Sequence, residues 1–227
     1  MILHLKQVLT PAELSSIHEV LRGAEWQAGR DSAGAQAASI KNNEQLSHQS
    51  GPMIDIRQRV LAALDRHPEF FSATLPRRVF PPRVNRYGGE SNFFGNHVDN
   101  AIRFAPDTGL RVRTDISCTL FLAEPSAYEG GELIFQESNT QRHVKLPAGD
   151  AIIYPGTTLH RVAPVTRGYR LACFFWVESM VRENDRRQLL FELDRSIVRL
   201  REAYGDNEHS VALTGTYHNL LRQWCDT

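Results

Sequence analysis

Residues 151–177 have the sequence AIIYPGTTLHRVAPVTRGYRLACFFWV, and this stretch decides the fold. Three short apolar runs, at residues 151–154, 158–162 and 169–177, alternate with turns that contain proline and glycine. Short runs that are rich in β-branched and aromatic residues and bounded by turn formers are typical of β-strands. The stretch therefore predicts a β fold.

The same pattern extends upstream to Arg77. Further strand-like runs have turn formers on both sides, and they are residues 79–87, 114–122, 132–136 and 143–146. Many short strands with regular turns predict a sandwich or a barrel, and a double-sheet jelly roll is one such architecture. We expect a mainly β protein with a jelly-roll core at residues 77–178, open between its sheets where a metal can bind.

The segment before this core is predicted to be mostly helical. Residues 1–9 predict a short strand, and Thr10 with Glu13 three positions later then predicts a helix that begins with a capping box. Residues 52–66 repeat apolar side chains at helical spacing. We expect residues 1–76 to be a helical support for the core.

Residues 29–45 interrupt this pattern, because they are small, polar and aperiodic. One interpretation is a surface loop. The other is a mobile lid that includes Lys41, since long loops in compact domains usually have a function. Both interpretations stay open at this point.

Residues 179–227 predict a C-terminal helical extension. Two apolar stripes at helical spacing support it, and their members are Leu190, Leu193, Ile197, Leu200, Tyr204, and then Tyr217, Leu220, Leu221 and Trp224. We favour a helical pair that docks on the barrel and completes its core. A homodimer contact or a substrate-docking surface is the alternative.

Composition limits the class of protein. The chain has 227 residues, 41% of them hydrophobic, which suits one domain with or without an appendage. Lys and Arg number 26 and balance 26 Asp and Glu, so we expect no nucleic-acid partner. We expect no secretory signal and no membrane span either, since no apolar run is long enough. Cys118, Cys173 and Cys225 lack paired spacing, which predicts reduced thiols in a cytoplasmic protein.

The chemistry is carried by His97-Val98-Asp99 followed by His160. Two imidazoles and one carboxylate on one face of a metal form the facial triad of non-haem Fe(II) oxygenases, which leaves the opposite positions open. A lone His-x-Asp is a weak signal in a chain with nine His. The motif is strengthened by the Gly- and Asn-rich turn at residues 87–92, because such a turn can present ligands from a rigid strand.

Arg170 strengthens the metal hypothesis further. It lies ten residues after His160, across a predicted hairpin turn that contains Pro164 and Gly168. Fe(II) centres of this kind use 2-oxoglutarate, whose distal carboxylate a guanidinium can bind through two parallel hydrogen bonds. We therefore predict that Arg170 binds this cosubstrate.

The roles predicted for the other site residues follow from their positions relative to Arg170 and to the metal motif. Alternate residues of a strand share a face, so Arg170, Phe174 and Trp176 point together. Trp176 is then a wall near the metal, or equally a core aromatic residue. Asn100 and Arg103 follow the metal motif closely and are candidates for substrate contact, although a surface-loop role is favoured.

These motifs resemble PKHD-type hydroxylases, a bacterial branch of the prolyl-4-hydroxylase-like Fe(II)/2-oxoglutarate-dependent dioxygenases. The matching stretches span nearly the whole chain and are residues 33–36, 41–43, 84–87, 96–100, 128–133, 159–162 and 168–170. The resemblance implies a jelly-roll core, Fe(II), 2-oxoglutarate and ascorbate (vitamin C) as reductant. It also implies that Tyr87 binds 2-oxoglutarate.

The leading hypothesis is therefore an Fe(II)- and 2-oxoglutarate-dependent dioxygenase. It uses O2 to hydroxylate an unactivated C–H bond of an unidentified small molecule or protein, and releases succinate and CO2. Nucleobase demethylation by the same core is disfavoured by the neutral charge. Two alternatives remain, a non-enzymatic metal-binding jelly-roll sensor and a cupin-like enzyme that does not use 2-oxoglutarate. Arg170 argues against the sensor, because a pure metal binder needs no carboxylate clamp. Dependence of O2 uptake on a cosubstrate would distinguish the cupin-like enzyme.

Overall fold

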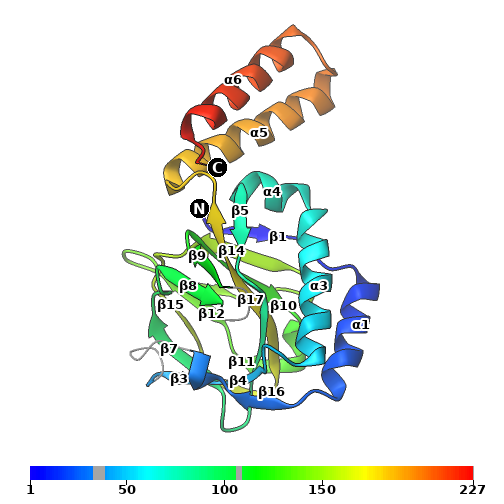
Figure 1. The fold of residues 1–227 in the computed structure, drawn as a ribbon, viewed down its shortest axis with the longest axis vertical. Helices are drawn as coiled ribbons and strands as arrows, with labels where there is room; N and C mark the ends of the chain where they lie inside the picture. Colours follow the sequence, from blue (N-terminus) through cyan, green and yellow to red (C-terminus); the bar gives the residue numbers. More distant parts are fainter. Residues whose placement is uncertain (33–38, 106–108, 227) are drawn as a thin grey trace.

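The computed structural model describes residues 1–32, 39–105 and 109–226. Two facing sheets form its centre, helices cover one side, and a helical hairpin projects from one end (Figure 1). Tyr87, Phe121 and Tyr154 of one sheet pack between the sheets against Phe135 and Val162 of the other. The prediction of a mainly β jelly-roll fold is confirmed.

All strand pairs are antiparallel. The larger sheet has the order β1 (Leu3–Leu5), β14 (Ala151–Pro155), β10 (Ile116–Phe121), β17 (Arg170–Ser179), β6 (Arg83–Tyr87), β4 (Glu44–Leu46) and β2 (Trp26–Ala28), with β5 (Pro76–Val79) also paired to β17. The smaller sheet has the order β13 (Gln141–Val144), β12 (Leu133–Gln136), β15 (His160–Val162), β7 (Phe93–His97) and β3 (Lys41–Asn42). Two separate ribbons pair β8 (Ile102–Ala105) with β9 (Leu110–Arg113) and β11 (Tyr128–Gly130) with β16 (Val165–Gly168).

The predicted hairpin between His160 and Arg170 is wrong. His160 begins β15 in the smaller sheet, whereas Arg170 begins β17 in the larger one. Between them, β16 pairs with β11, and Gly168 at φ 73° lies so close to Ala127 that a Cβ there would be 2.2 Å from its carbonyl oxygen. The chain therefore crosses between the sheets here, which brings both residues to the same interior.

Helices cover the outer face of the larger sheet. They are α1 (Pro11–Arg22), α3 (Gly51–Asp65) and α4 (Pro68–Thr74), and two short 3₁₀ turns lie at Gly29–Ser32 and Pro125–Ala127. The predicted capping box of Thr10 and Glu13 begins α1. Ile17, Met53 and Ile56 are fully buried in the cluster that joins these helices to the sheet. Residues 1–76 also contribute strands β1 to β4 to the two sheets, which the prediction of a helical support omitted.

The surface-loop interpretation is wrong for residues 41–46, because they form β3 and β4. Lys41 is only 5% exposed. Strands of two or three residues are too short to produce a periodic pattern, which is why the segment resembled a loop. The lid hypothesis also involves residues 33–38, which lie outside the described residues.

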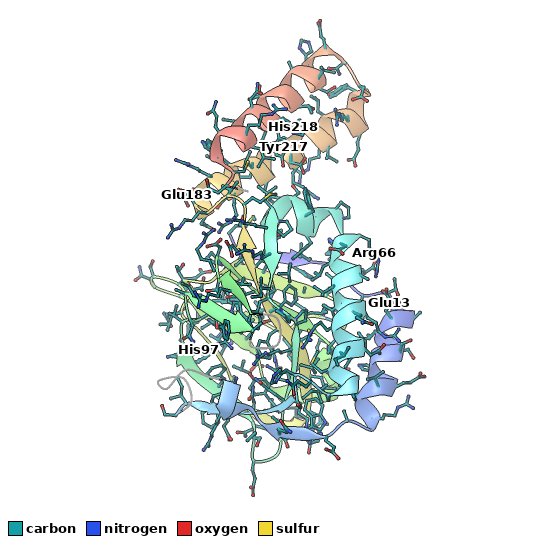
Figure 2. The ribbon with its side chains drawn as sticks, viewed as in Figure 1. Glu13, Arg66, His97, Glu183, Tyr217 and His218 are labelled. Carbon is teal, nitrogen blue, oxygen red and sulfur yellow. The ribbon has the colours of Figure 1, made fainter. Side chains whose placement is uncertain are left out.

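Helices α5 (Asn184–Tyr204) and α6 (Glu208–Trp224) form the projecting hairpin. Leu190, Ile197 and Tyr217 are buried in a cluster of their own, together with Leu75 and Val181. Phe191 of α5 is the member of the pair that joins the core cluster of the larger sheet, so the pair packs mainly on itself and only in part on that core. Figure 2 places Tyr217 in the hairpin and His97 in the β region, toward opposite ends of the molecule. None of the described helices combines the length and apolarity that a membrane crossing requires.

Candidate metal centre

The structure brings together the three residues of the predicted triad. His97 is the last residue of β7 and pairs in register with His160 of β15, and Asp99 follows β7 by two residues. One nitrogen of each imidazole and one carboxylate oxygen of Asp99 all lie within 4.8 Å of one another. This spacing suits a single metal ion, and the donor set of two imidazoles and one carboxylate suits Fe(II).

Main-chain carbonyls orient both imidazoles. Nδ1 of His97 lies 2.8 Å from the carbonyl oxygen of Gly95, and Nδ1 of His160 lies 2.9 Å from that of Thr158. A carbonyl only accepts, so each Nδ1 carries the proton and each Nε2 keeps a lone pair for a metal. The sequence gives no sign of these partners, because every residue has a carbonyl.

The carboxylate of Asp99 is held in place as well. The hydroxyl of Ser117 on β10 donates to its Oδ2 over 2.6 Å, which fixes the carboxylate from the larger sheet. Oδ2 lies 4.0 Å from Nε2 of His160. Ser117 was not predicted, because its role depends on the pairing of strands that are distant in sequence.

The imidazole of His97 is kept in the form that binds metal. Burial, together with the neighbouring His160, lowers the pKa of His97 to about 4. A neutral imidazole is required for coordination, so the site is ready at neutral pH without releasing a proton from His97. Phe94 stacks on His97 with ring centroids 3.6 Å apart and covers one face of the imidazole.

The hydroxyl of Tyr154 also reaches this centre. It lies 3.2 Å from Nε2 of His160, and burial raises the pKa of Tyr154 so that the phenol stays protonated. Its position beside a metal-facing nitrogen was missed from the sequence, where Tyr154 is one of several aromatic residues of a strand.

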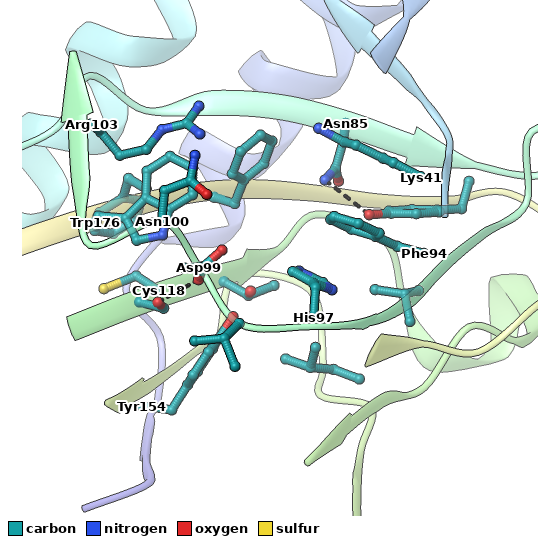
Figure 3. Close-up of a pocket in the computed structure, with 18 of the residues that line it drawn as sticks. Lys41, Asn85, Phe94, His97, Asp99, Asn100, Arg103, Cys118, Tyr154 and Trp176 are labelled. Carbon is teal, nitrogen blue, oxygen red and sulfur yellow. Dashed lines mark hydrogen bonds between the residues drawn. The ribbon is translucent and has the colours of Figure 1, made fainter. Parts of the chain in front are cut away.

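One pocket connects His97 and Asp99 of the triad with the other predicted residues (Figure 3). Besides His97 and Asp99, its lining includes the predicted residues Lys41, Tyr87, Asn100, Arg103, Arg170 and Trp176. Arg170, Phe174 and Trp176 all line it, as the alternation of the strand predicts. Asn85 and Phe94 were not predicted.

Arg170 is a buried cation that lines this pocket. It is 1% exposed, and its guanidinium carbon lies 5.3 Å and 5.2 Å from the ring centroids of Tyr87 and Phe121. Its Nε has no hydrogen-bond partner, and no carboxylate among the described residues forms an ion pair with it. A buried charge is costly unless it is paired, so this arrangement suits an anionic ligand.

Tyr87 accompanies Arg170. The two residues pair in register between β6 and β17, and Nδ2 of Asn85 lies 3.4 Å from the hydroxyl of Tyr87. Burial raises the pKa of Tyr87, so its hydroxyl remains protonated and can donate to an anion beside Arg170.

Lys41, Arg103 and Trp176 line the same pocket, with Arg103 beside Trp176 and Lys41 beside Asn85 and Phe94 (Figure 3). Arg103 lies on β8 with its guanidinium carbon 4.6 Å from the ring of Trp176 and 5.7 Å from that of Phe80. Trp176 is 6% exposed and packs with Phe80 in a core cluster, so it is both a pocket wall and a core residue. Asn100 also lines the pocket, and its carbonyl accepts from Thr114 over 2.6 Å.

Two family models match the chain. The 2OG-Fe(II) oxygenase superfamily model matches residues 82–178, which hold the triad and Arg170, and the PKHD-type hydroxylase C-terminal domain model matches residues 184–226. The fold and the site thus define a 2-oxoglutarate- and Fe(II)-dependent oxygenase.

Full-length relatives define the group within this class. The chain is 56% identical over 227 residues to a PKHD-type hydroxylase of Verminephrobacter eiseniae and 49% identical over 227 residues to one of Nitrosomonas europaea, with all of each chain covered. The chain belongs to the PKHD-type hydroxylase family.

Solved structures with lower identity support the fold. A prolyl hydroxylase from Trichoplax adhaerens, solved in complex with a hypoxia inducible factor peptide fragment, matches with a TM-score of 0.58 at 13% identity, covering 83% of this chain and 86% of that one. A 2OG-Fe(II) oxygenase family oxidoreductase from Burkholderia pseudomallei matches with a TM-score of 0.53 at 17% identity, covering 81% and 85%.

Proposed function

We propose that His97, Asp99 and His160 hold the Fe(II) of this hydroxylase and that Arg170 and Tyr87 bind its 2-oxoglutarate. One observation carries the proposal. The buried guanidinium of Arg170 has an Nε without a partner among the described residues and lines the same pocket as His97 and Asp99 of the triad. A metal-binding protein without a carboxylate ligand would have no use for this costly group.

The bound Fe(II) and 2-oxoglutarate supply the oxidising chemistry, in which 2-oxoglutarate leaves as succinate and CO2 and one oxygen atom of O2 enters a substrate C–H bond. The protein's part is to orient the reactants. Gly95 and Thr158 fix the tautomers of the two imidazoles, and Ser117 fixes the carboxylate of Asp99. Arg170 binds the distal carboxylate of 2-oxoglutarate through two parallel hydrogen bonds, and Tyr87 donates a third.

Aromatic side chains around the triad exclude water. Phe94 covers His97, and Phe174 and Trp176 form the neighbouring wall. Exclusion of water strengthens the charge interactions within the pocket and protects reactive species. In this interpretation Trp176 shapes the pocket.

Several narrower predictions belong to the same proposal. The division of the chain at residues 76 and 178 is supported by the limits of the two matching family models, 82–178 and 184–226. Ascorbate as reductant, a cytoplasmic location, a lid at residues 29–45 and a homodimer through α5 and α6 stay predictions. The primary substrate is a small molecule or a protein.

The test is an anaerobic titration of the protein with Fe(II) and then with 2-oxoglutarate. We expect a weak visible charge-transfer absorbance that develops only when both are present, followed by succinate formation on admission of air. Iron binding without any effect of 2-oxoglutarate would favour the metal-binding sensor or the cupin-like alternative. A surface variant, Arg167→Gln, is the matched control, since Arg167 is exposed and pairs with Glu129.

A further inference from the structure

The hydroxyl of Tyr154 lies at the metal centre without being part of the triad. Tyr154 is on β14, is 4% exposed and lines the pocket, and its hydroxyl oxygen lies 3.2 Å from Nε2 of His160. The rings of Phe135 and His160 pack against its ring, with centroids 4.8 Å and 4.9 Å away. In Figure 3 Tyr154 reaches from below toward Asp99 and His97. Packing therefore holds the phenol at the triad.

The phenol is the donor in this hydrogen bond. Nδ1 of the His160 imidazole carries a proton, which it donates to the carbonyl of Thr158, so Nε2 has a lone pair and no proton. The O–H of Tyr154 therefore points at the lone pair that a metal ion has to take. This hydrogen bond and a metal ion on Nε2 exclude each other.

Metal binding leaves the phenol proton in need of another acceptor, because a buried donor without a partner is costly. The neighbouring ligands are already engaged. Asp99 accepts from Ser117 through Oδ2 and needs an oxygen for the metal, and Nε2 of His97 faces the metal as well. Burial raises the pKa of Tyr154, and the hydrogen bond with Thr119 opposes this shift, as a donor to the phenol oxygen does. The proton is therefore available to an oxygen that arrives with the metal.

Under the proposed function, such oxygens belong to 2-oxoglutarate. Arg170 binds its distal carboxylate, so the opposite end of the molecule, with the 2-oxo group and the other carboxylate, is the end that chelates the metal. Both groups of this end accept hydrogen bonds, and neither can donate one. The phenol of Tyr154 is a donor beside a metal-facing nitrogen in the same pocket, which matches the chelating end in chemistry and in place.

We propose that Tyr154 binds the chelating end of 2-oxoglutarate, and that its hydroxyl changes acceptor from Nε2 of His160 in the metal-free protein to an oxygen of the 2-oxo acid in the complex. The inference rests on the proposed function and adds a residue that recognises the end of the cosubstrate opposite Arg170. Ser117 pairs in register with Tyr154 across β10 and β14 and donates to Asp99. One cross-strand pair of hydroxyls thus serves both a ligand and the cosubstrate.

The experiment compares 2-oxoglutarate with pyruvate, which has the same chelating end but no distal carboxylate. Full-length wild type, Tyr154→Phe and Arg170→Ala are loaded with Fe(II) under argon, and each acid is titrated by its charge-transfer absorbance. Tyr154→Phe keeps the ring and its packing and removes only the donor, so it should weaken both acids by a similar factor of about 3- to 10-fold. Arg170→Ala should weaken 2-oxoglutarate and leave pyruvate within about 2-fold of wild type.

Two further measurements separate this role from support of the fold. Iron affinity in Tyr154→Phe should change by less than about 3-fold, because the wild-type phenol exchanges one acceptor for another, whereas Ser117→Ala should lose about 10-fold. The charge-transfer maximum of Tyr154→Phe should move to shorter wavelength, since the lost hydrogen bond stabilised the negative charge that the transition places on the 2-oxo acid. Tyr217→Phe is the matched control, because this buried tyrosine belongs to the separate cluster of the helical hairpin, and it should match the wild type throughout.

Three outcomes would overturn this inference. Tyr154→Phe could leave both acids within about 2-fold of wild type, or it could weaken 2-oxoglutarate but not pyruvate, which would place the phenol at the distal carboxylate. It could also raise iron affinity by more than about 3-fold, and the phenol would then only compete with the metal. Failure of the wild-type protein to bind either acid at Fe(II) is a different result, which would overturn the proposed function itself.

Discussion

The cationic residues that line the pocket come from different parts of the fold, with Arg170 on one side of the comparison and Lys41 and Arg103 on the other. Arg170 lies between Tyr87 and Phe121, 1% exposed, at the start of a central strand. Lys41 and Arg103 lie on β3 at a sheet edge and on the separate β8–β9 ribbon. A central strand of the larger sheet therefore holds Arg170, whereas Lys41 and Arg103 are carried by an edge strand and by a separate ribbon. The position of Arg170 thus depends on the pairing at the centre of the sheet, and the positions of Lys41 and Arg103 depend on pairing at its periphery.

The largest expected effect on activity comes from substitution of the metal ligands. Asp99→Ala should abolish turnover and greatly weaken iron binding, because it removes the only carboxylate of the triad and leaves Ser117 without its acceptor. Iron affinity by anaerobic titration and succinate formation are the measurements. Ser117→Ala is the graded control and should weaken metal binding by about 10-fold. Full activity in Asp99→Ala would refute the triad.

Arg170→Ala should separate 2-oxoglutarate binding from iron binding. Loss of a charge-assisted double contact in a buried pocket should cost about 2–5 kcal/mol, or about 30-fold to several-thousand-fold in 2-oxoglutarate affinity. Iron affinity should change little, because Arg170 is not a ligand. Arg170→Lys should recover only part of the affinity, since an ammonium cannot present two parallel donors. Unchanged 2-oxoglutarate binding in Arg170→Ala would contradict the assignment of Arg170 as the residue that binds this cosubstrate.

The residues that sequence spacing located are those whose chemistry is carried by the side chain itself. His97, Asp99, His160 and Arg170 combine residue type with order along the chain. The structure groups the first three as a triad, and His97 and Asp99 line one pocket with Arg170. The carbonyls of Gly95 and Thr158 could not be predicted, because a main-chain partner has no residue-type signal.

Long-range pairing accounts for most of what sequence reasoning got wrong. Local alternation cannot distinguish a hairpin from a crossing between two sheets, so His160 and Arg170 were expected on adjacent strands. Lys41 was expected in a loop or lid because β3 has two residues. Its pairing with Phe94, more than fifty positions away, is what buries it beside the metal site.

Lys41→Met should have a small effect on 2-oxoglutarate binding but a clear effect on stability. The pKa of Lys41 is about 7 in the folded protein and 10.5 when unperturbed, so the unfolded chain binds the extra proton between these values. Folding therefore becomes less favourable as pH falls from 10.5 to 7, with an upper limit of about 5 kcal/mol. Lys41→Met removes this penalty, whose main cause is burial, with Arg103 and Arg83 next and Asp99 opposing them.

The measurement for Lys41→Met is the melting temperature of metal-free protein across this pH range. We expect the variant to exceed the wild type by several degrees at pH 7, equivalent to about 2 kcal/mol, and to approach it at pH 10.5. Equal stability at both pH values would mean that the charge of Lys41 carries no folding cost.

The smallest effect on iron and 2-oxoglutarate binding is expected from substitutions in the helical hairpin. Ile197 is 4% exposed in a cluster that is separate from the residues between the sheets, so Ile197→Ala should destabilise the packing of α5 and α6 by about 2–5 kcal/mol. Hydrogen exchange of residues 184–224 should increase, while iron and 2-oxoglutarate affinities stay within about 2-fold of wild type, because distant sites without shared contacts are nearly independent. The control is Ile152→Ala, which leaves a cavity between the sheets and should weaken cosubstrate binding as well. A large loss of 2-oxoglutarate affinity in Ile197→Ala would mean that the hairpin and the pocket are coupled, and the site would then have to be understood together with the C-terminal helices.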